Sequence, residues 1–210
     1  MDIQVWSDVI CPWCYIGKRR LEEALRGISA TTVTYRAYQL DPAPVPRPVP
    51  LKTALADKFG GRARAEQMFD HVRSIAADDG LDLNFDLAVA ANTFDAHRLI
   101  AWAATQGRQA AMLDALQVAH FTHGVDIGSH AELARLAGAI GLDQAAARAS
   151  LSTADGVDDV MADLRAARDF GITSVPTFVI DGRYAVQGAQ EVEVLRSAFA
   201  EIERREAVSS

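Results

Sequence analysis

Residues 8–25 read DVICPWCYIGKRRLEEAL and contain both cysteines of the chain, Cys11 and Cys14. Just before this run, Ile3 and Val5 alternate with polar residues, which is the period of a β-strand. After the cysteines, apolar residues recur at helical spacing between charged ones. The sequence therefore predicts a strand that leads into a helix, with the cysteine pair at the junction.

The predicted helix runs from about Pro12 to Arg26, so Cys11 stands at its start. Unpaired N–H groups and the positive end of the helix dipole favour an anion there, and we expect them to stabilise the thiolate of Cys11. Pro12 has no N–H to lose at an early helical position. Cys11, nearer the solvent, would attack a substrate disulfide, and Cys14, one turn on, would resolve the mixed disulfide. This exchange needs no cofactor.

Two other interpretations of the cysteine pair exist. A zinc site needs two more ligands, and the chain has no third cysteine. His120 and His123 could supply them in principle, but they lie on an ordinary predicted helix without a matching acid. The second alternative is a pair of inert core cysteines. We favour redox chemistry and expect no metal.

The composition is that of a globular protein, because half of the 210 residues are apolar and 23% are charged. The formal net charge of -7 argues against a polyanionic partner. Lys18, Arg19 and Arg20 form a basic cluster on the predicted helix, where we expect a solvated face. No run approaches the ~18 apolar residues of a membrane span. We therefore expect neither nucleic acid nor membrane as a partner.

The compartment is indicated by the amino terminus and by cysteine usage. The chain begins MDIQVW, without the basic, apolar and small-residue regions of a secretory signal. The two cysteines are three positions apart, so no pair remains for a structural disulfide across the fold. We expect a cytoplasmic protein.

Proline marks a boundary after a predicted strand at 32–40. Five of the seven prolines stand at every second residue from Pro42 to Pro50, in a segment that can form neither helix nor ladder. We interpret it as a stiff connector, with a polyproline ligand for another domain as the alternative. From 51 to 151 the chain is predicted to be almost wholly helical, apart from a short alternating run at 81–85.

The last part of the chain returns to mixed structure, and Asp181-Gly182 is a strong hairpin signal. In chain order, the predicted elements are a helix around Val160, a loop at 171–175, a strand at 177–180, a strand at 184–186 and an amphipathic helix from Val192 to Ile202.

A second motif, Ser174-Val175-Pro176-Thr177, directly precedes the strand at 177–180. The CPWC at the start of a first helix, the long helical stretch and the Val-Pro before a late strand resemble the DsbA family. More narrowly, four segments resemble its FrnE-like cytoplasmic branch. They are the CPWCYIGKRRLE run, residues 92–99 (NTFDAHRL), residues 124–127 (GVDI) and the turn at 188–190 (GAQ). The resemblance covers nearly the whole chain.

The resemblance implies an α/β, thioredoxin-like fold with a large all-helical insertion domain. The thioredoxin-like domain would comprise 1–50 and 152–210, and the insertion 51–151. In such proteins the proline is cis and packs beside the redox pair, which carries over to Pro176. It would turn the backbone of Val175 outward to pair with an extended substrate. A trans proline that opens an edge strand is the alternative.

One position departs from the best-known DsbA proteins, which carry histidine in the third motif position to help hold the thiolate. Trp13 offers only an indole donor and apolar surface. Reduction or shuffling of wrong disulfides is therefore expected rather than periplasmic oxidation.

Several residues are weaker candidates. Asp8 could relay a proton to or from Cys14, or be a solvated or capping residue. By resemblance, Asn92 and His97 face the redox site and contact substrate, but Asn92 equally suits a plain N-cap and His97 an ordinary core or surface histidine. Trp13 and Tyr15 are expected to form an apolar rim.

The sequence thus predicts a protein disulfide oxidoreductase of the reductase or isomerase type. Its partner would be a disulfide-containing polypeptide or a small-molecule disulfide, with glutathione as an optional reductant or co-substrate. One alternative is a glutathione-dependent isomerase or transferase of the hydroxychromene-carboxylate isomerase or kappa type, although these generally carry serine or a lone polar group where Cys11 stands. The other is a redox-responsive, polypeptide-binding holdase. The oligomeric state is left open.

Overall fold

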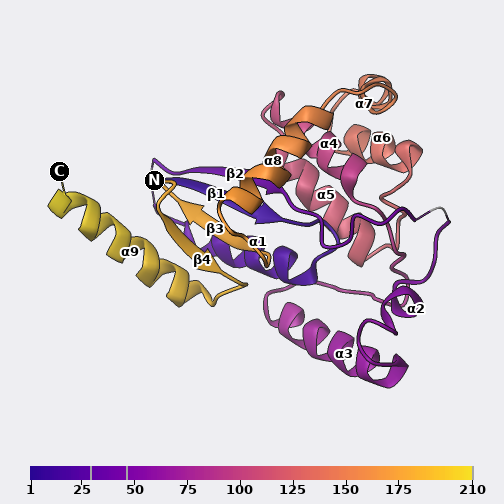
Figure 1. Ribbon diagram of the computed structural model, residues 1–210, viewed down its shortest axis with the longest axis horizontal. Helices are drawn as coiled ribbons and strands as arrows, with labels where there is room; N and C mark the ends of the chain where they lie inside the picture. The colour runs from indigo at the N-terminus through magenta and orange to yellow at the C-terminus, as the bar shows by residue number, and fades with distance from the viewer. Residues whose placement is uncertain (29, 46, 210) are drawn as a thin grey trace.

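A computed structural model describes residues 1–28, 30–45 and 47–209 of the chain, so Pro46 of the proline segment lies outside the described residues. A mixed sheet of order β2-β1-β3-β4 lies at the centre (Figure 1). β1 pairs in parallel with β2 and antiparallel with β3, and β3 pairs antiparallel with β4. The strands are β1 (Asp2–Ser7), β2 (Thr32–Ala37), β3 (Thr177–Ile180) and β4 (Tyr184–Gln187). The two ends of the sequence therefore meet in one sheet.

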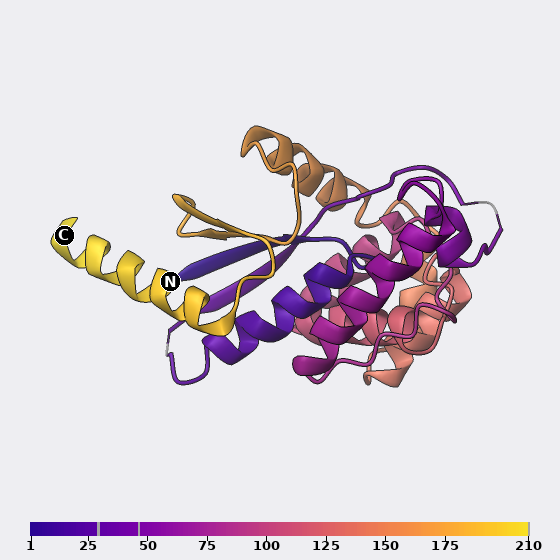
Figure 2. The same ribbon diagram turned by 90° about the horizontal axis from the view of Figure 1, so that it is seen from below.

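Helices cover both faces of this sheet (Figure 2). On one face lie α1 (Pro12–Ala24) and α9 (Val192–Ser209), and on the other lies α8 (Val157–Asp169). The alternation along β1 explains the layers, since Ile3 and Val5 join the core that includes α1 and α9. Trp6 points the other way and packs with Ala167 of α8.

The remaining helices form two groups, and along the chain both groups lie between β2 and β3 (Figure 1). One group comprises α4 (Phe94–Ala104), α5 (Gln109–Phe121), α6 (His130–Ala139) and α7 (Gln144–Leu151). The other comprises α2 (Leu51–Leu55) and α3 (Arg62–Asp78). A continuous apolar core runs from the sheet into α4–α7, and a second surrounds α3 and the side of α1. The division into 1–50 with 152–210 and 51–151 stays a prediction.

Most elements lie where the hydrophobic pattern placed them, and the strand Thr177–Ile180 has the predicted bounds. The alternating run at 81–85 is not a strand, although Leu81, Leu83 and Phe85 are buried. They fill the second core without a strand partner. Within the described ranges, no helix is both long and apolar enough to cross a membrane.

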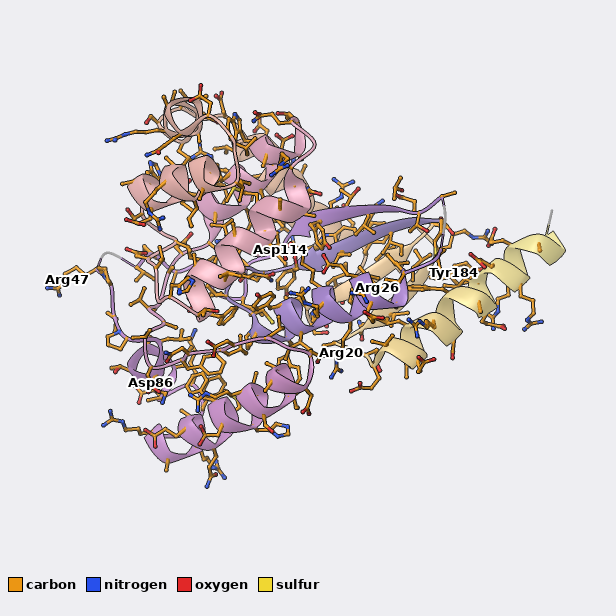
Figure 3. All side chains as sticks on the ribbon, turned by 180° about the vertical axis from the view of Figure 1, so that it is seen from behind. Arg20, Arg26, Arg47, Asp86, Asp114 and Tyr184 are labelled. Carbon is orange, nitrogen blue, oxygen red and sulfur yellow. The ribbon has the colours of Figure 1, made fainter. Side chains whose placement is uncertain are left out.

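The basic cluster on α1 is not the solvated face that the sequence predicted. Lys18 is 2% exposed and donates to Asp114 of α5 at 2.6 Å. Arg20 is 6% exposed and donates to Asp79, at the end of α3, at 2.8 Å. Only Arg19 of the three is exposed. The helix is covered by α3, α5 and α9, so its charges bind neighbouring elements (Figure 3).

Candidate active site

The two cysteines lie at the start of α1, which leaves the sheet from β1. Cys11 is the N-cap residue, with extended backbone angles, and Pro12 follows in the first helical position. The N–H of Cys14 donates to the carbonyl of Cys11 at 3.0 Å. Both are free thiols and buried, but Cys11 lines a cavity and Cys14 does not. A substrate entering that cavity therefore meets Cys11 first.

The loop before β3 reaches Cys11 from the far end of the sequence. The Val175–Pro176 peptide bond is cis. The Cys11 thiol donates to the carbonyl oxygen of Val175, with 3.8 Å between sulfur and oxygen. Val175 is half-buried and Pro176 is buried. The structure thus brings together the cysteine motif and the Val-Pro motif, which are well over a hundred residues apart.

Gly17 permits this approach, and the sequence reasoning missed it. A Cβ atom at Gly17 would lie 2.8 Å from Cγ of Pro176 and 3.4 Å from the ring of Phe178. Because real Cβ atoms do not approach so closely, only glycine lets the proline lie against α1. A glycine inside a helical pattern was the available signal, since it costs about 1 kcal/mol relative to alanine.

Burial raises the pKa of the second thiol, that of Cys14. Desolvation raises the pKa of Cys14 well above its ordinary value, and the hydrogen bond and charge of the Cys11 sulfur raise it further. The Asp8 carboxylate acts in the same direction, whereas a backbone hydrogen bond from Asp8 opposes them. Cys14 is therefore protonated at neutral pH, and its attack requires a base.

Asp8 and His97 form a buried polar pair behind the cysteines. Asp8 is 0% exposed, which excludes the solvated residue considered from the sequence. Its Oδ2 accepts from the N–H of Leu40 at 2.8 Å, and its Oδ1 lies 3.3 Å from Nε2 of His97. That nitrogen also lies 2.9 Å from the carbonyl oxygen of Tyr38. Since a carbonyl only accepts, Nε2 of His97 carries the hydrogen.

His97 also lines a second cavity, although its side chain is only 4% exposed. This cavity of about 310 Å³ lies between β2, α4 and α8, and Ser7 and Asp163 line it as well. The pair His97 and Asp8 therefore lies between this cavity and the start of α1.

Asn92 ties the start of α4 to the proline segment. Its Oδ1 accepts from the N–H of Phe94 at 2.9 Å, and its Nδ2 donates to the carbonyls of Pro42 and Ala43. By backbone geometry the N-cap residue is Thr93. Asn92 does not line the cavity beside Cys11, so the structure does not bring it to the sulfurs.

The two rim candidates differ. Trp13 lines the cavity beside Cys11. Tyr15 is 5% exposed and stacks on Phe121 with 6.1 Å between ring centroids. The prediction that Tyr15 forms part of the rim is wrong, because its side of α1 faces the second core.

Two unexpected polar side chains lie in α5. Gln117 and His120 are 0% exposed, and their polar side-chain atoms have no hydrogen-bond partner. Burial lowers the pKa of His120 from 6.5 to about 4, with the Asp8 charge opposing the change. His120 is thus neutral at neutral pH. In the part of the chain that the structure describes, no three His, Cys, Asp or Glu side chains gather as a metal site.

A known protein family and several solved structures share this fold. A family model described as DSBA-like thioredoxin domain matches residues 2–200. The crystal structure of a probable DsbA oxidoreductase from Streptomyces coelicolor has a TM-score of 0.88 and 36% identity, covering 96% of this chain and 89% of that one.

Two more distant structures share the fold. The cytosolic disulfide reductase DsbM from Pseudomonas aeruginosa has a TM-score of 0.65 and 24% identity, covering 98% of this chain and 99% of its own. A 2-hydroxychromene-2-carboxylate isomerase has a TM-score of 0.73 and 18% identity, covering 100% of both chains.

Proposed function

The chain belongs to the family of DSBA-like thioredoxin domains, and we propose that it is a thiol–disulfide oxidoreductase of the reductase or isomerase type. One observation carries the proposal. Cys11, at the start of α1, lines a cavity and lies against the carbonyl of Val175, while Cys14 stands one turn behind it. This arrangement offers an attacking sulfur, a resolving sulfur and an edge of backbone for substrate.

The reaction begins when the Cys11 thiolate attacks one sulfur of a substrate disulfide. The substrate S–S bond breaks, a first thiolate leaves, and Cys11 is held in a mixed disulfide. Cys14 then loses its proton and attacks the Cys11 sulfur, which releases the second substrate thiolate. Two electrons pass from the protein to the substrate, and the protein disulfide is reduced again by a cellular thiol such as glutathione.

Asp8 is the proposed base for Cys14. The raised pKa of Cys14 requires one, and the Asp8 carboxylate is near enough to raise that pKa further. His97 positions the Asp8 carboxylate by donating from Nε2. The second cavity, which His97 lines, offers a route by which the proton taken from Cys14 leaves. Val175 contributes its carbonyl, which is released to pair with an extended substrate once Cys11 is a thiolate.

The motif and the expected compartment support reduction or isomerisation as the direction of electron flow. Trp13 supplies no cation to hold the thiolate, so the pair suits reduction or shuffling of disulfides better than net oxidation. A cytoplasmic location, as in the FrnE-like branch, agrees with this direction, and so does the likeness to a cytosolic disulfide reductase.

Reduction of insulin by the purified protein tests the proposal. Wild-type protein should accelerate it in the presence of a thiol reductant, and Cys11→Ser should abolish the acceleration. Full activity of Cys11→Ser would rule the mechanism out.

A second candidate is a glutathione-dependent isomerase. It is favoured by the likeness to a 2-hydroxychromene-2-carboxylate isomerase and by the apolar cavity. Such chemistry does not need a second cysteine. Turnover of an aromatic substrate with glutathione that is unchanged in Cys14→Ser would favour this candidate over disulfide exchange.

A further inference from the structure

We propose that the cavity beside Cys11 binds the apolar body of a small-molecule disulfide that carries a carboxylate at its far end. The proposal rests on the thiol–disulfide exchange proposed above and names the substrate class of the same site.

The cavity has the size and position of a small-molecule site. Its volume is about 760 Å³, within the range of roughly 300–1,000 Å³ that such sites occupy. Its lining includes Cys11 and Trp13 at the start of α1, Leu55 of α2 and Met68 of α3. The attacking sulfur is thus part of the wall that a bound molecule would touch.

The lining favours an apolar occupant. Aliphatic and aromatic side chains make up most of it, among them Leu40, Val45, Val49, Leu51, Phe69 and Phe85. Each methylene group that moves from water into such a lining favours binding by about fourfold. A polypeptide backbone would bring N–H and carbonyl groups that need partners, and the lining offers few polar ones. A small apolar body therefore fits this cavity better than an extended chain.

The charges at the rim favour an anionic end group. Lys58 and Asp41 pair with each other, and the hydrogen bond from Lys58 lowers the pKa of Asp41. Arg47 is exposed and makes no ion pair or hydrogen bond with any described residue. It lies at the outer tip of the segment between β2 and α2 (Figure 3). In a chain of net charge -7, this unpaired guanidinium attracts a carboxylate, which it can hold with two hydrogen bonds.

On such a substrate the exchange proceeds in two steps. The Cys11 thiolate attacks the nearer sulfur, the S–S bond breaks, and one ω-mercapto acid leaves. Cys14 passes its proton to Asp8 and attacks Cys11, which releases the second mercapto acid. The protein dithiol is oxidised to a disulfide, and the substrate disulfide is reduced to two thiols.

A chain-length series at constant charge tests the proposal. Reduced protein is mixed with 3,3′-dithiodipropionate or with 8,8′-dithiodioctanoate, and the thiol released in a single turnover is followed by stopped flow. Each rate is divided by the rate of the same disulfide with dithiothreitol, which removes intrinsic reactivity. We expect the longer disulfide to react at least tenfold faster, because burial of two methylene groups is enough for about that factor.

Two matched pairs of variants locate the effect. Ala54→Trp fills the cavity from α2, and Thr53→Trp adds the same bulk at a neighbouring exposed position outside the lining. Ala54→Trp should reduce the ratio of long to short rates to below about threefold, whereas Thr53→Trp should keep it. Arg47→Gln should slow both dicarboxylates several-fold, while Arg165→Gln on α8 should not.

The outcomes separate this proposal from the proposed function. No reaction with insulin or with either disulfide, or equal reaction by Cys11→Ser, would refute the exchange itself. Reduction of insulin without reaction of either dicarboxylate would overturn the cavity proposal alone. Reaction of both disulfides at equal normalised rates, or the same ratio in the two tryptophan variants, would overturn the cavity proposal alone. It would also be overturned if an unfolded cystine-containing polypeptide reacted faster than both and only Ala54→Trp slowed it, because the cavity would then serve polypeptide side chains.

Discussion

At the residue scale, the chemistry depends on a proton that Cys14 must lose inside the protein. Cys14 is 2% exposed and Asp8 is 0% exposed, so bulk water does not reach either freely. The carboxylate is kept in place by the N–H of Leu40 and by His97. The sequence alone placed Asp8 three residues before Cys11 but left a solvated role open, since burial is set by the helices that cover the strand end.

Asp8→Asn should slow resolution of the mixed disulfide by roughly 100-fold at neutral pH, because an amide cannot take the proton of Cys14. Since the pKa of Cys14 is raised, its thiolate forms unaided only in alkaline solution, and the two rates should converge as the pH rises. Stopped-flow release of the second thiol between about pH 6 and about pH 10 measures this. Asp158→Asn on α8 is the control, and a constant ratio across the range would contradict the role of Asp8.

Gly17→Ala should destabilise the protein, although alanine is the better helix former. The new Cβ would lie 2.8 Å from the ring of Pro176, which cannot move aside like a flexible chain. We expect a loss of about 1–3 kcal/mol in the free energy of unfolding, with a slower reaction of Cys11. Gly138→Ala in α6 is the control, because its nearest neighbour is the flexible Gln144. Denaturant unfolding of both variants measures the difference, and equal effects would contradict the packing argument.

At the element scale, α1 is held by charges as well as by its apolar face. Lys18 pairs with Glu22 on its own helix and with Asp114 on α5, and the two acids are 40% and 45% exposed. The pattern of charges along the helix suggested a solvated face because sequence periodicity does not show how many neighbours a helix has. The loss of stability on removing one acidic partner of Lys18 should depend on whether Lys18 keeps the other.

Removing both Glu22 and Asp114 should lower the free energy of unfolding far more than removing either one alone. Glu22→Gln and Asp114→Asn together leave a buried, uncompensated ammonium, for which we expect a loss of about 3 kcal/mol. Each single variant should cost less than half of that. Adding Lys18→Met to the double variant should recover most of the stability. Additive single effects in denaturant unfolding would show that Lys18 is not held in this way.

Helix α5 carries a buried histidine, His120, which we expect to make the fold acid-sensitive. The pKa of His120 is lowered from 6.5 to about 4, so the unfolded chain binds the proton more tightly than the folded protein. Above the pKa of His120 in the unfolded chain, the protein keeps its full stability with respect to this group. It loses stability as the pH falls from that value toward the pKa of His120 in the folded protein. The drop from 6.5 to about 4 corresponds to roughly 3 kcal/mol.

His120→Leu should remove most of that acid sensitivity. We expect its free energy of unfolding to change less between neutral pH and about pH 4.5 than that of wild-type protein. His71→Leu on the exposed side of α3 is the control. Equal acid losses in wild-type protein and in His120→Leu would contradict the assignment.

At the scale of the whole molecule, the site is made from both ends of the sequence. β1 leads into Cys11 and β3 follows Pro176, and these two strands are neighbours in the sheet. The pairing explains why a motif near residue 11 and a motif near residue 176 meet. The cavity adds a third part, because the segment between β2 and α2 and the helices α2 and α3 close over the start of α1.

The sequence predicted the features of the site that have local signals and missed those that depend on packing. The cysteines, Pro176 and the strand at 177–180 carry signals in their immediate neighbours. The contact of Gly17 with Pro176, the burial of Lys18 and the cavity arise between elements remote in sequence. Periodicity specifies which face of an element is apolar, but not which element covers it.

In the proposed mechanism Cys11 attacks and Cys14 resolves, and trapping the mixed disulfide distinguishes the two roles. Cys14→Ser and Cys11→Ser are each mixed with a disulfide substrate and their intact masses are measured. We expect Cys14→Ser to gain the mass of one substrate thiol, mapped to Cys11, and Cys11→Ser to gain none. Stable modification of Cys14 in Cys11→Ser, with Cys11 unmodified in Cys14→Ser, would contradict it.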